Sequence, residues 1–128
     1  MRKVFHLSSC NTCQKILKET NAASVCELQD IKVQNIQADD LDWLASKVGS
    51  YEALFSRKAL KYRAMGLHEK QLTEGDYRRL ILEEYTFLKR PVFIIDDAVF
   101  VGNLAKTVQT VKEKILMMND EFLRLVIL

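Results

Sequence analysis

The chain has 128 residues, of which 48% are apolar, 28% charged and 9% aromatic, the proportions of one compact globular domain. Its 19 Lys and Arg against 17 Asp and Glu leave a net charge of +2, which is too balanced to indicate nucleic acid or an anionic membrane as a partner. No apolar run approaches the roughly 18 residues of a membrane-spanning helix. We expect a single domain over residues 1–128. The start has no secretory signal, so we expect this domain to lie in the cytoplasm.

The three cysteines are the chemically most informative residues. Their odd number, in a chain without a signal peptide, argues against a secreted disulfide framework. Cys10 and Cys13 form a Cys-x-x-Cys motif. A zinc site would need two further ligands, and the chain offers only Cys26, His6 and His68, so no metal is expected. Cys26 is expected to be a core thiol; its alternative is a third redox partner.

A strand–helix–strand unit opens the chain. Residues 3–7 are rich in β-branched and aromatic side chains, which predicts a short strand. A polar turn then leads into a helix with Ser9 or Asn11 as its N-cap, ending near residues 20–22. A second strand is predicted over residues 24–31. Such a unit pairs its strands in parallel through a right-handed crossover.

The middle of the chain is predicted to be helical. Apolar spacing indicates one helix over about 38–48, stopped by Gly49. A second helical stretch is predicted from about 54 to 67. Thr73 is placed to cap a third helix, whose apolar face runs through Tyr85.

A hairpin and a helix complete the chain. Pro91, the only proline, leads into Val92–Ile95, an apolar run typical of a buried central strand. A tight turn then joins it to a partner strand over 99–102. Beyond it, apolar residues recur at helical spacing, in one helix or in two with a break near 119–120. This stripe packs on the sheet or forms a coiled-coil seam between two copies; its residues are Leu104, Val108, Val111, Ile115, Met118, Phe122 and Leu125.

The element order predicts the fold class. Strand–helix–strand followed by hairpin–helix is the β-α-β … β-β-α order of an α/β protein with a thioredoxin-like core. The helices over about 37–88 form an insert within it.

The position of the cysteine motif predicts a reactive thiol. Cys10 falls between a strand and a helix, where free backbone N–H groups and the helix dipole favour a thiolate. Cys13 lies one turn further along, so its sulfur can attack a mixed disulfide formed on Cys10. The spacing therefore indicates a redox pair.

Other side chains are candidates to assist this pair. A protonated His6 would favour the thiolate, although a strand histidine is also commonly a satisfied polar residue. Thioredoxin-like folds carry a cis proline before the buried strand, and Pro91 occupies that place. Arg90 would then direct its guanidinium toward the thiolate or a bound oxyanion; its alternative is a surface arginine. Arg57 is a further anion-binding candidate, unless it only solvates a helix face.

Taken together, spaced motifs over about residues 3–115 resemble the ArsC/Spx family of glutaredoxin-dependent arsenate reductases and their relatives. The motifs are Phe5-His6-x3-Cys10-x2-Cys13, Leu54-Phe55-Ser56-Arg57, Tyr62-Arg63-x-Met65-Gly66-Leu67, Leu88-Lys89-Arg90-Pro91-Val92 and Val101-Gly102. The family has a thioredoxin-like fold with a helical insert.

The resemblance implies roles for matching residues. Cys10 matches the cysteine that attacks arsenate, and His6 the histidine that assists its ionisation. Arg90 matches an oxyanion-binding arginine and Pro91 the cis proline. Cys13 replaces a serine of the arsenate reductases, and Spx-like proteins have a cysteine there.

Two further oxyanion arginines of the arsenate reductases have no direct counterpart. One aligns with Ser56, beside which Arg57 is the candidate replacement. The other falls near Gly102, which has no side chain.

Two functions follow as hypotheses. The first is an arsenate reductase-like thiol–disulfide oxidoreductase acting on a small oxyanion or a disulfide. Its Cys10 adduct is resolved by Cys13 or glutathione, and glutaredoxin or thioredoxin supplies electrons, with no bound cofactor. The alternative is an Spx-like redox-switch regulator that binds RNA polymerase and makes no direct contact with nucleic acid.

Overall fold

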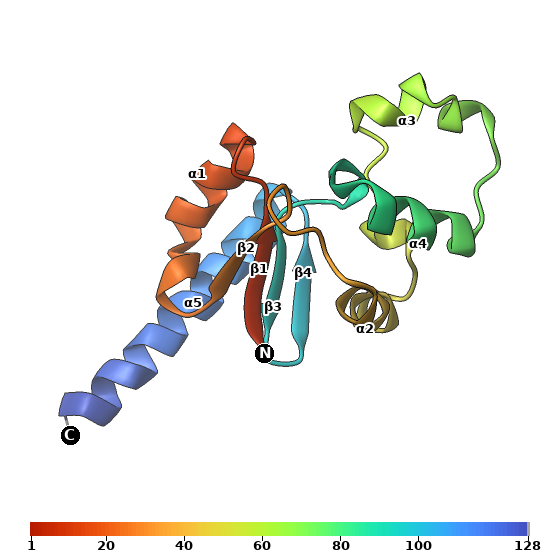
Figure 1. Cartoon of the computed structure of the whole chain (residues 1–128). Helices are drawn as coiled ribbons and strands as arrows, with labels where there is room; N and C mark the ends of the chain where they lie inside the picture. The colour runs from red at the N-terminus through yellow and green to blue at the C-terminus, as the bar shows by residue number, and fades with distance from the viewer. Residues whose placement is uncertain (128) are drawn as a thin grey trace. The chain divides into compact units, whose positions relative to one another are not determined.

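The computed structural model describes residues 1–127, which divide into two compact units (Figure 1). One unit combines Met1–Asp30 with the chain from Arg90 onward, and the other is Ile31–Lys89. The helices predicted over about 37–88 all lie in this second unit. The cysteine motif and Arg90 lie in the first.

The first unit contains a four-stranded sheet in the order β2-β1-β3-β4. The interior strand β1 pairs in parallel with β2 and antiparallel with β3, and β3 forms an antiparallel hairpin with β4. The arrangement confirms the predicted thioredoxin-like α/β core. The strands are β1 (Arg2–His6), β2 (Glu27–Asp30), β3 (Val92–Ile95) and β4 (Ala98–Val101).

The second strand is shorter than predicted. Residues 24–31 were expected to be extended, but β2 covers only Glu27–Asp30. Asn21 adopts φ 57° at the end of the first helix, and Ala22–Ser24 continues as a 3-10 turn, η1. The Cys26 N–H donates to the Ala22 carbonyl oxygen at 2.9 Å. The first residues of the predicted strand therefore form hydrogen bonds within a turn instead of with β1.

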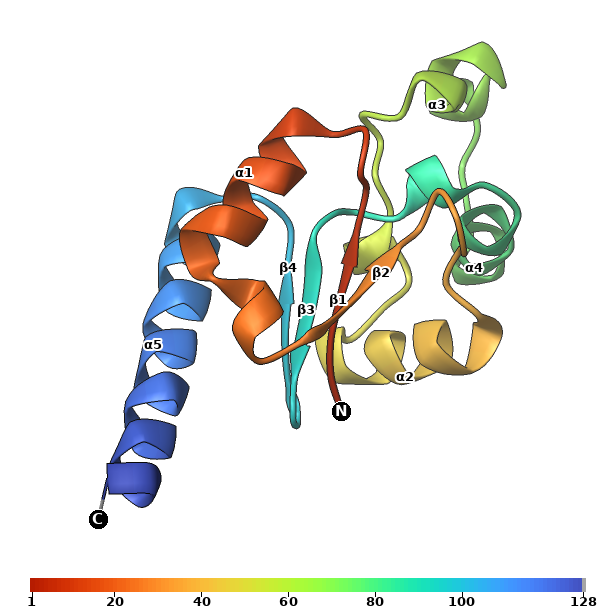
Figure 2. The same cartoon turned by 60° about the vertical axis from the view of Figure 1, so that its left-hand side comes forward.

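Two helices cover one face of this sheet, α1 (Asn11–Thr20) and α5 (Ala105–Ile127) (Figures 1 and 2). They are amphipathic, and their apolar side chains meet those of the sheet, because burial of this surface provides most of the stability of such layers. The shared core comprises Val4, Ile16, Leu17, Ala22, Cys26, Phe93, Ile95, Val108, Val111 and Ile115. All four residues of β3 are buried, as predicted.

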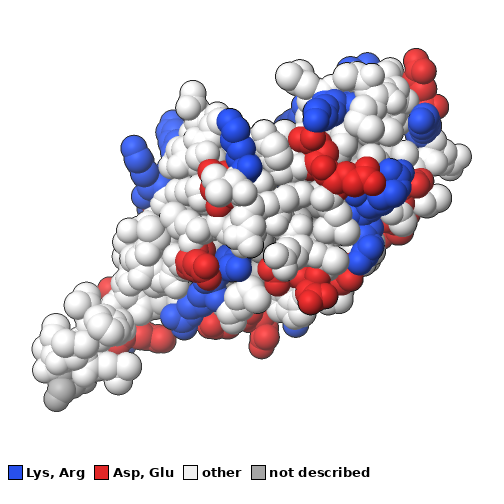
Figure 3. All heavy atoms as spheres, viewed as in Figure 1, with Lys and Arg blue, Asp and Glu red and all other residues white. Residues whose placement is uncertain are grey.

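The final helix α5 is continuous, so the predicted alternative of a break near 119–120 is wrong. Its apolar stripe changes role along its length. Val111 and Ile115 are buried, whereas Phe122 is 65% exposed and Leu125 is 82% exposed. Figure 3 shows mainly uncharged atoms at this end of the molecule. Within residues 1–127, no helix combines the length and apolarity needed to cross a membrane.

This division predicts unequal effects of shortening the stripe. Ile115→Ala is expected to lower the free energy of unfolding by about 2–4 kcal/mol, because it leaves a cavity in the core. Leu125→Ala, the matched control, is expected to change it by less than about 0.5 kcal/mol. Urea unfolding followed by circular dichroism measures both. Equal losses would show that the end of the helix is packed as tightly as its middle.

The second unit is built from short helices and turns. Two predicted boundaries are confirmed: Gly49 ends α2 with φ +102°, and Thr73 forms a reciprocal capping box with Asp76 at the start of α4. The elements are α2 (Ala38–Val48), η2 (Glu52–Leu54), α3 (Leu60–Ala64), η3 (Leu67–Glu69), α4 (Glu74–Glu83) and η4 (Tyr85–Phe87).

The helical stretch predicted over about 54–67 is largely wrong. Phe55 is extended and forms an isolated antiparallel bridge with Leu88. The Phe55 ring stacks on Phe87, with centroids 5.0 Å apart, and is fully buried. Because Phe55 pairs with the distant Leu88, it cannot be helical. Within the predicted stretch, only Leu60–Ala64 is α-helical. The predicted third helix also ends before Tyr85, which belongs to η4.

Candidate active site

The site begins where β1 passes into α1. Cys10 is the N-cap residue, with an extended backbone (φ −97°, ψ 109°), so the predicted caps Ser9 and Asn11 are wrong. The Cys10 carbonyl accepts a hydrogen bond from the Gln14 N–H at 3.0 Å, which closes the first helical turn. No side chain caps this end of the helix. The half-buried Cys10 thiol therefore adjoins the positive end of α1, where N–H groups lack intrahelical acceptors.

Cys13 lies one turn further on and is only 1% exposed. Burial raises the pKa of the Cys13 thiol, and a backbone hydrogen bond from Leu7 lowers it. Among smaller effects, the charge of Cys10 raises this pKa and the charge of Arg90 lowers it. The two cysteines are thus unequal: one is accessible and the other is a buried, protonated thiol beside it.

Arg90 and Pro91 lie directly before β3. The peptide bond between them is cis, which confirms the prediction for Pro91. The Pro91 carbonyl oxygen accepts a hydrogen bond from the Gly102 N–H at 2.9 Å. Among the buried side-chain nitrogen and oxygen atoms of the described chain, only Arg90 Nε has no hydrogen-bond partner. Arg90 is therefore suited to bind an anion, because it is a cation with an unpaired buried donor. Its charge also lowers the pKa of Cys13.

Gly102 ends the hairpin in a conformation that favours glycine, with φ +91°. A side chain there would be strained, whatever space surrounds it. Gly102 therefore offers no side chain to a bound oxyanion.

His6 ends β1 and is 9% exposed. Burial lowers the pKa of His6, and the charge of Asp30, its register partner on β2, opposes this effect. The imidazole Nδ1 lies 3.2 Å from the side-chain nitrogen of Gln14. These surroundings favour neutral His6, whereas the sequence-based hypothesis for its role invoked the protonated ring.

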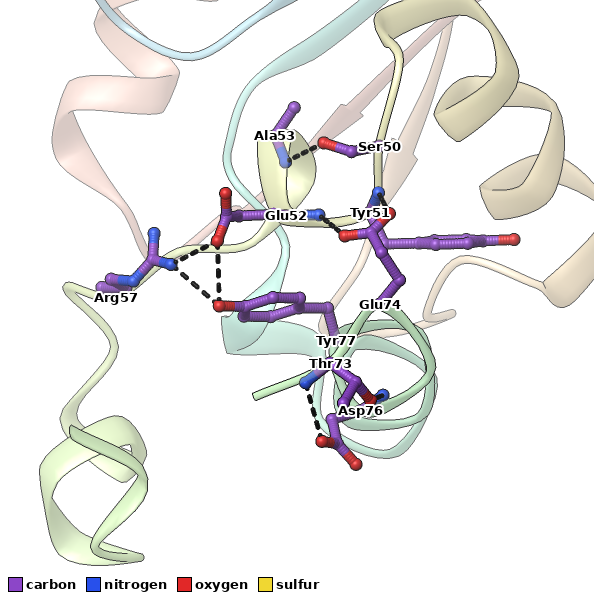
Figure 4. A network of polar contacts seen from close by, with 9 residues as sticks. All are labelled: Ser50, Tyr51, Glu52, Ala53, Arg57, Thr73, Glu74, Asp76 and Tyr77. Atoms are coloured by element: carbon purple, nitrogen blue, oxygen red, sulfur yellow. Dashed lines mark hydrogen bonds and ion pairs between the residues drawn. The ribbon is translucent and has the colours of Figure 1, made fainter. Parts of the chain in front are cut away.

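Arg57 belongs to the second unit, where it forms part of a polar network (Figure 4). Its Nη2 donates to Glu52 Oε2 at 3.0 Å and to the Tyr77 hydroxyl at 2.9 Å. The Tyr77 hydroxyl in turn donates to Glu52 Oε2 at 3.1 Å. Glu74 accepts the backbone N–H groups of Tyr51 and Glu52 and so supports the same turn. The charge of Arg57 is paired, unlike the orphaned Nε of Arg90.

Sequence reasoning missed Gln14 and Asp30. Asp30 Oδ1 accepts the Ser8 N–H at 3.3 Å, and Asp30 lies beside His6 in the β1–β2 register. The predicted parallel pairing of the two strands could have indicated that Asp30 lies beside His6. For Gln14 the only signal was its position four residues after Cys10, one helical turn along.

Cys26 is separate from the motif. It is buried in the core cluster that includes Val4 and Ile95, as predicted, and burial raises the pKa of its thiol. All three cysteines are free thiols. The residues that the structure describes contain no group of three His, Cys, Asp or Glu side chains arranged to hold a metal ion.

Comparisons with known proteins agree on fold and family. The sequence profile of the ArsC family matches residues 5–111. An arsenate reductase from Vibrio cholerae is 15% identical, with a TM-score of 0.69 over 88% of this chain and 97% of the other. An ArsC-related protein from Brucella melitensis is 21% identical, with a TM-score of 0.66 over 85% and 92%.

A further solved structure, of a Bacteroides fragilis protein assigned to the ArsC family, is 20% identical. Its TM-score is 0.74 over 86% of this chain and 96% of that one. No curated protein shows a significant match. The fold and the paired thiols define a protein of the thioredoxin-like class. Since the family profile spans most of its length, the chain belongs to the ArsC family, and this membership supports a thiol-based oxidoreductase.

Proposed function

We propose that this protein is an arsenate reductase-like thiol–disulfide oxidoreductase in which the Cys10 thiolate is the nucleophile. The observation that carries the proposal is the unequal cysteine pair. Cys10 is accessible at the N-terminus of α1, while Cys13 is buried one turn further along the helix. The charges of Cys10 and Arg90 both affect the pKa of Cys13. This difference in exposure supports Cys10 as the thiol that meets the substrate.

In the first step Cys10 attacks the oxidised centre of the substrate. With a disulfide, the thiolate bonds to one sulfur and the other leaves as a thiolate. With arsenate, it bonds to arsenic and an oxygen leaves as water after taking up protons. Arg90 steadies the negative charge on the substrate, since a fixed cation in a site shielded from water stabilises charge more than water does.

In the second step a thiol attacks the sulfur of Cys10, and the electron pair of the broken bond stays with the departing group. The thiol is Cys13, which gives up its proton, or glutathione. The departing group is the second thiolate of the disulfide, or arsenic reduced from the +5 to the +3 state. The resulting disulfide is reduced again by glutathione with glutaredoxin, or by thioredoxin.

Arg90 makes the larger contribution to binding the anion. Its buried Nε is an unmatched donor, and the guanidinium fork suits pairs of oxygen atoms. Arg57 already donates to Glu52, which offsets its charge. Arg57 is therefore the weaker of the two candidates.

Alkylation of the cysteines with and without arsenate tests the proposal. At pH 7 iodoacetamide is expected to label Cys10 at least about tenfold faster than Cys13 or Cys26, because those thiols are buried and protonated. Arsenate in excess is expected to slow labelling of Cys10. The same buffer at matched ionic strength, without arsenate or sulfate, is not expected to slow it. Peptide mass spectrometry identifies the labelled residue.

Two other outcomes would contradict either arsenate as the substrate or Cys10 as the nucleophile. Fast labelling without protection by arsenate would leave a disulfide substrate, or the redox switch that binds RNA polymerase. Copurification with polymerase would then favour the switch. Labelling of Cys10 no faster than that of the buried cysteines would overturn its role as nucleophile.

A further inference from the structure

The side chain of Gln14 joins the histidine of the site to the backbone. Its Nε2 lies 2.9 Å from the Leu7 carbonyl oxygen and 3.2 Å from His6 Nδ1. All three residues are at the junction of β1 and α1, directly beside the cysteine motif. No part of the reaction described above uses Gln14.

The carbonyl oxygen of Leu7 determines which way this amide points. A carbonyl can only accept, so the atom facing it must be the amide nitrogen rather than the amide oxygen. That same nitrogen faces His6 Nδ1, and its two hydrogens serve the two acceptors. His6 Nδ1 must therefore accept a hydrogen bond, and a neutral ring that accepts there carries its proton on Nε2.

We propose that Gln14 is a positioning residue that holds His6 as the neutral tautomer with its proton on Nε2. His6 then acts in the site as a hydrogen-bond donor and not as a cationic partner of the thiolate. The second statement rests on the proposed function, whereas the tautomer follows from the contacts of Gln14 alone.

Protonation of His6 would disrupt this arrangement. An N–H at Nδ1 would face the donor hydrogen of Gln14. Turning the amide to offer its oxygen to the ring would place its nitrogen away from the Leu7 carbonyl and leave two oxygens facing each other. Burial acts in the same direction by lowering the pKa of His6, while Asp30 on β2 opposes it.

A neutral His6 changes which groups supply positive charge at the site. If His6 is neutral, positive charge near the cysteine pair comes from Arg90 and from the N-terminus of α1. His6 Nε2–H remains available to donate to a bound oxygen or sulfur without adding a charge.

Nitrogen NMR of the uniformly ¹⁵N-labelled protein tests the tautomer directly. The chain has two histidines, and His68, in the second unit, serves as the internal reference. At pH 7, His6 is expected to show a protonated Nε2 and an unprotonated Nδ1. The Gln14→Glu variant keeps the length of the side chain but offers only acceptor oxygens. In that variant the pKa of His6 is expected to rise by at least about one unit, with protonation at Nδ1.

The ring-nitrogen resonances of His68 are expected to be the same in both proteins. A wild-type His6 that is cationic at pH 7, or that carries its proton on Nδ1, would overturn the proposal. So would a Gln14→Glu variant with an unchanged His6. If the variant does not fold, the wild-type spectrum decides alone. The spectrum is recorded without substrate, so it distinguishes failure of this inference from failure of Cys10 as nucleophile.

Discussion

Cys10→Ser is expected to reduce thiol-dependent reduction of arsenate or of a model disulfide by at least about a thousandfold. A serine hydroxyl stays protonated at neutral pH, so it cannot replace a thiolate as the attacking group. The remaining rate reflects solution thiols acting on the substrate without the protein. Turnover with glutathione and glutaredoxin, or with thioredoxin, as the electron supply measures the loss.

Cys13→Ser is expected to separate the two steps. The first attack by Cys10 remains, but the mixed disulfide on Cys10 accumulates because the buried resolving thiol is missing. Mass spectrometry of the intact protein detects this adduct after one turnover. Full activity without an adduct would instead assign resolution to glutathione.

Cys26→Ala provides the control for both variants. Cys26 lies in the core, away from the motif, so its removal is expected to leave turnover unchanged. A Cys26→Ala variant as inactive as Cys10→Ser would contradict the assignment of the nucleophile.

Arg90→Met is expected to lower kcat/KM for an oxyanion substrate by about a hundred- to a thousandfold, the usual effect of removing one donor to a developing anion. The buried Arg90 Nε has no partner among residues 1–127, so its hydrogen bond is free for the substrate. Arg90→Lys is expected to restore only part of the rate, because an ammonium group lacks the planar fork. Steady-state kinetics with arsenate measures all three proteins.

Arg57→Met is the matched control in the second unit. Arg57 is bonded to Glu52 and Tyr77, so its loss is expected to have a smaller effect on kcat/KM than the loss of Arg90. Circular dichroism establishes that each variant is folded. A larger loss in Arg57→Met than in Arg90→Met would reverse the assignment of the anion-binding arginine.

Local patterns predicted the parts of the site that depend on neighbours in the chain. The junction of strand and helix at Cys10 and the cis bond before Pro91 were predicted, and so, outside the site, was Thr73 as the N-cap of α4. Each is determined by the chemistry of a few consecutive residues: a helix end, an X-Pro bond, and a hydroxyl three residues before a carboxylate.

The errors occurred where distant segments compete for a backbone. Phe55 has helical spacing around it, yet it pairs with Leu88 and stacks on Phe87. Cys26 carries strand-like neighbours, yet its N–H is used by the turn at Ala22. In both cases a hydrogen bond or ring contact outweighs a weak local preference.

The sequence by itself determined the fold class, the position of the Cys-x-x-Cys motif between a strand and a helix, and the order of elements that places Arg90 before β3. Only the tertiary structure decided that Gln14 contacts His6, that Arg57 pairs with Glu52, and that Arg90 Nε has no partner among the described residues. The physical reason is that helix ends, apolar periods and proline act over a few residues. The partner of a polar side chain, by contrast, depends on which distant groups folding brings within about 3 Å.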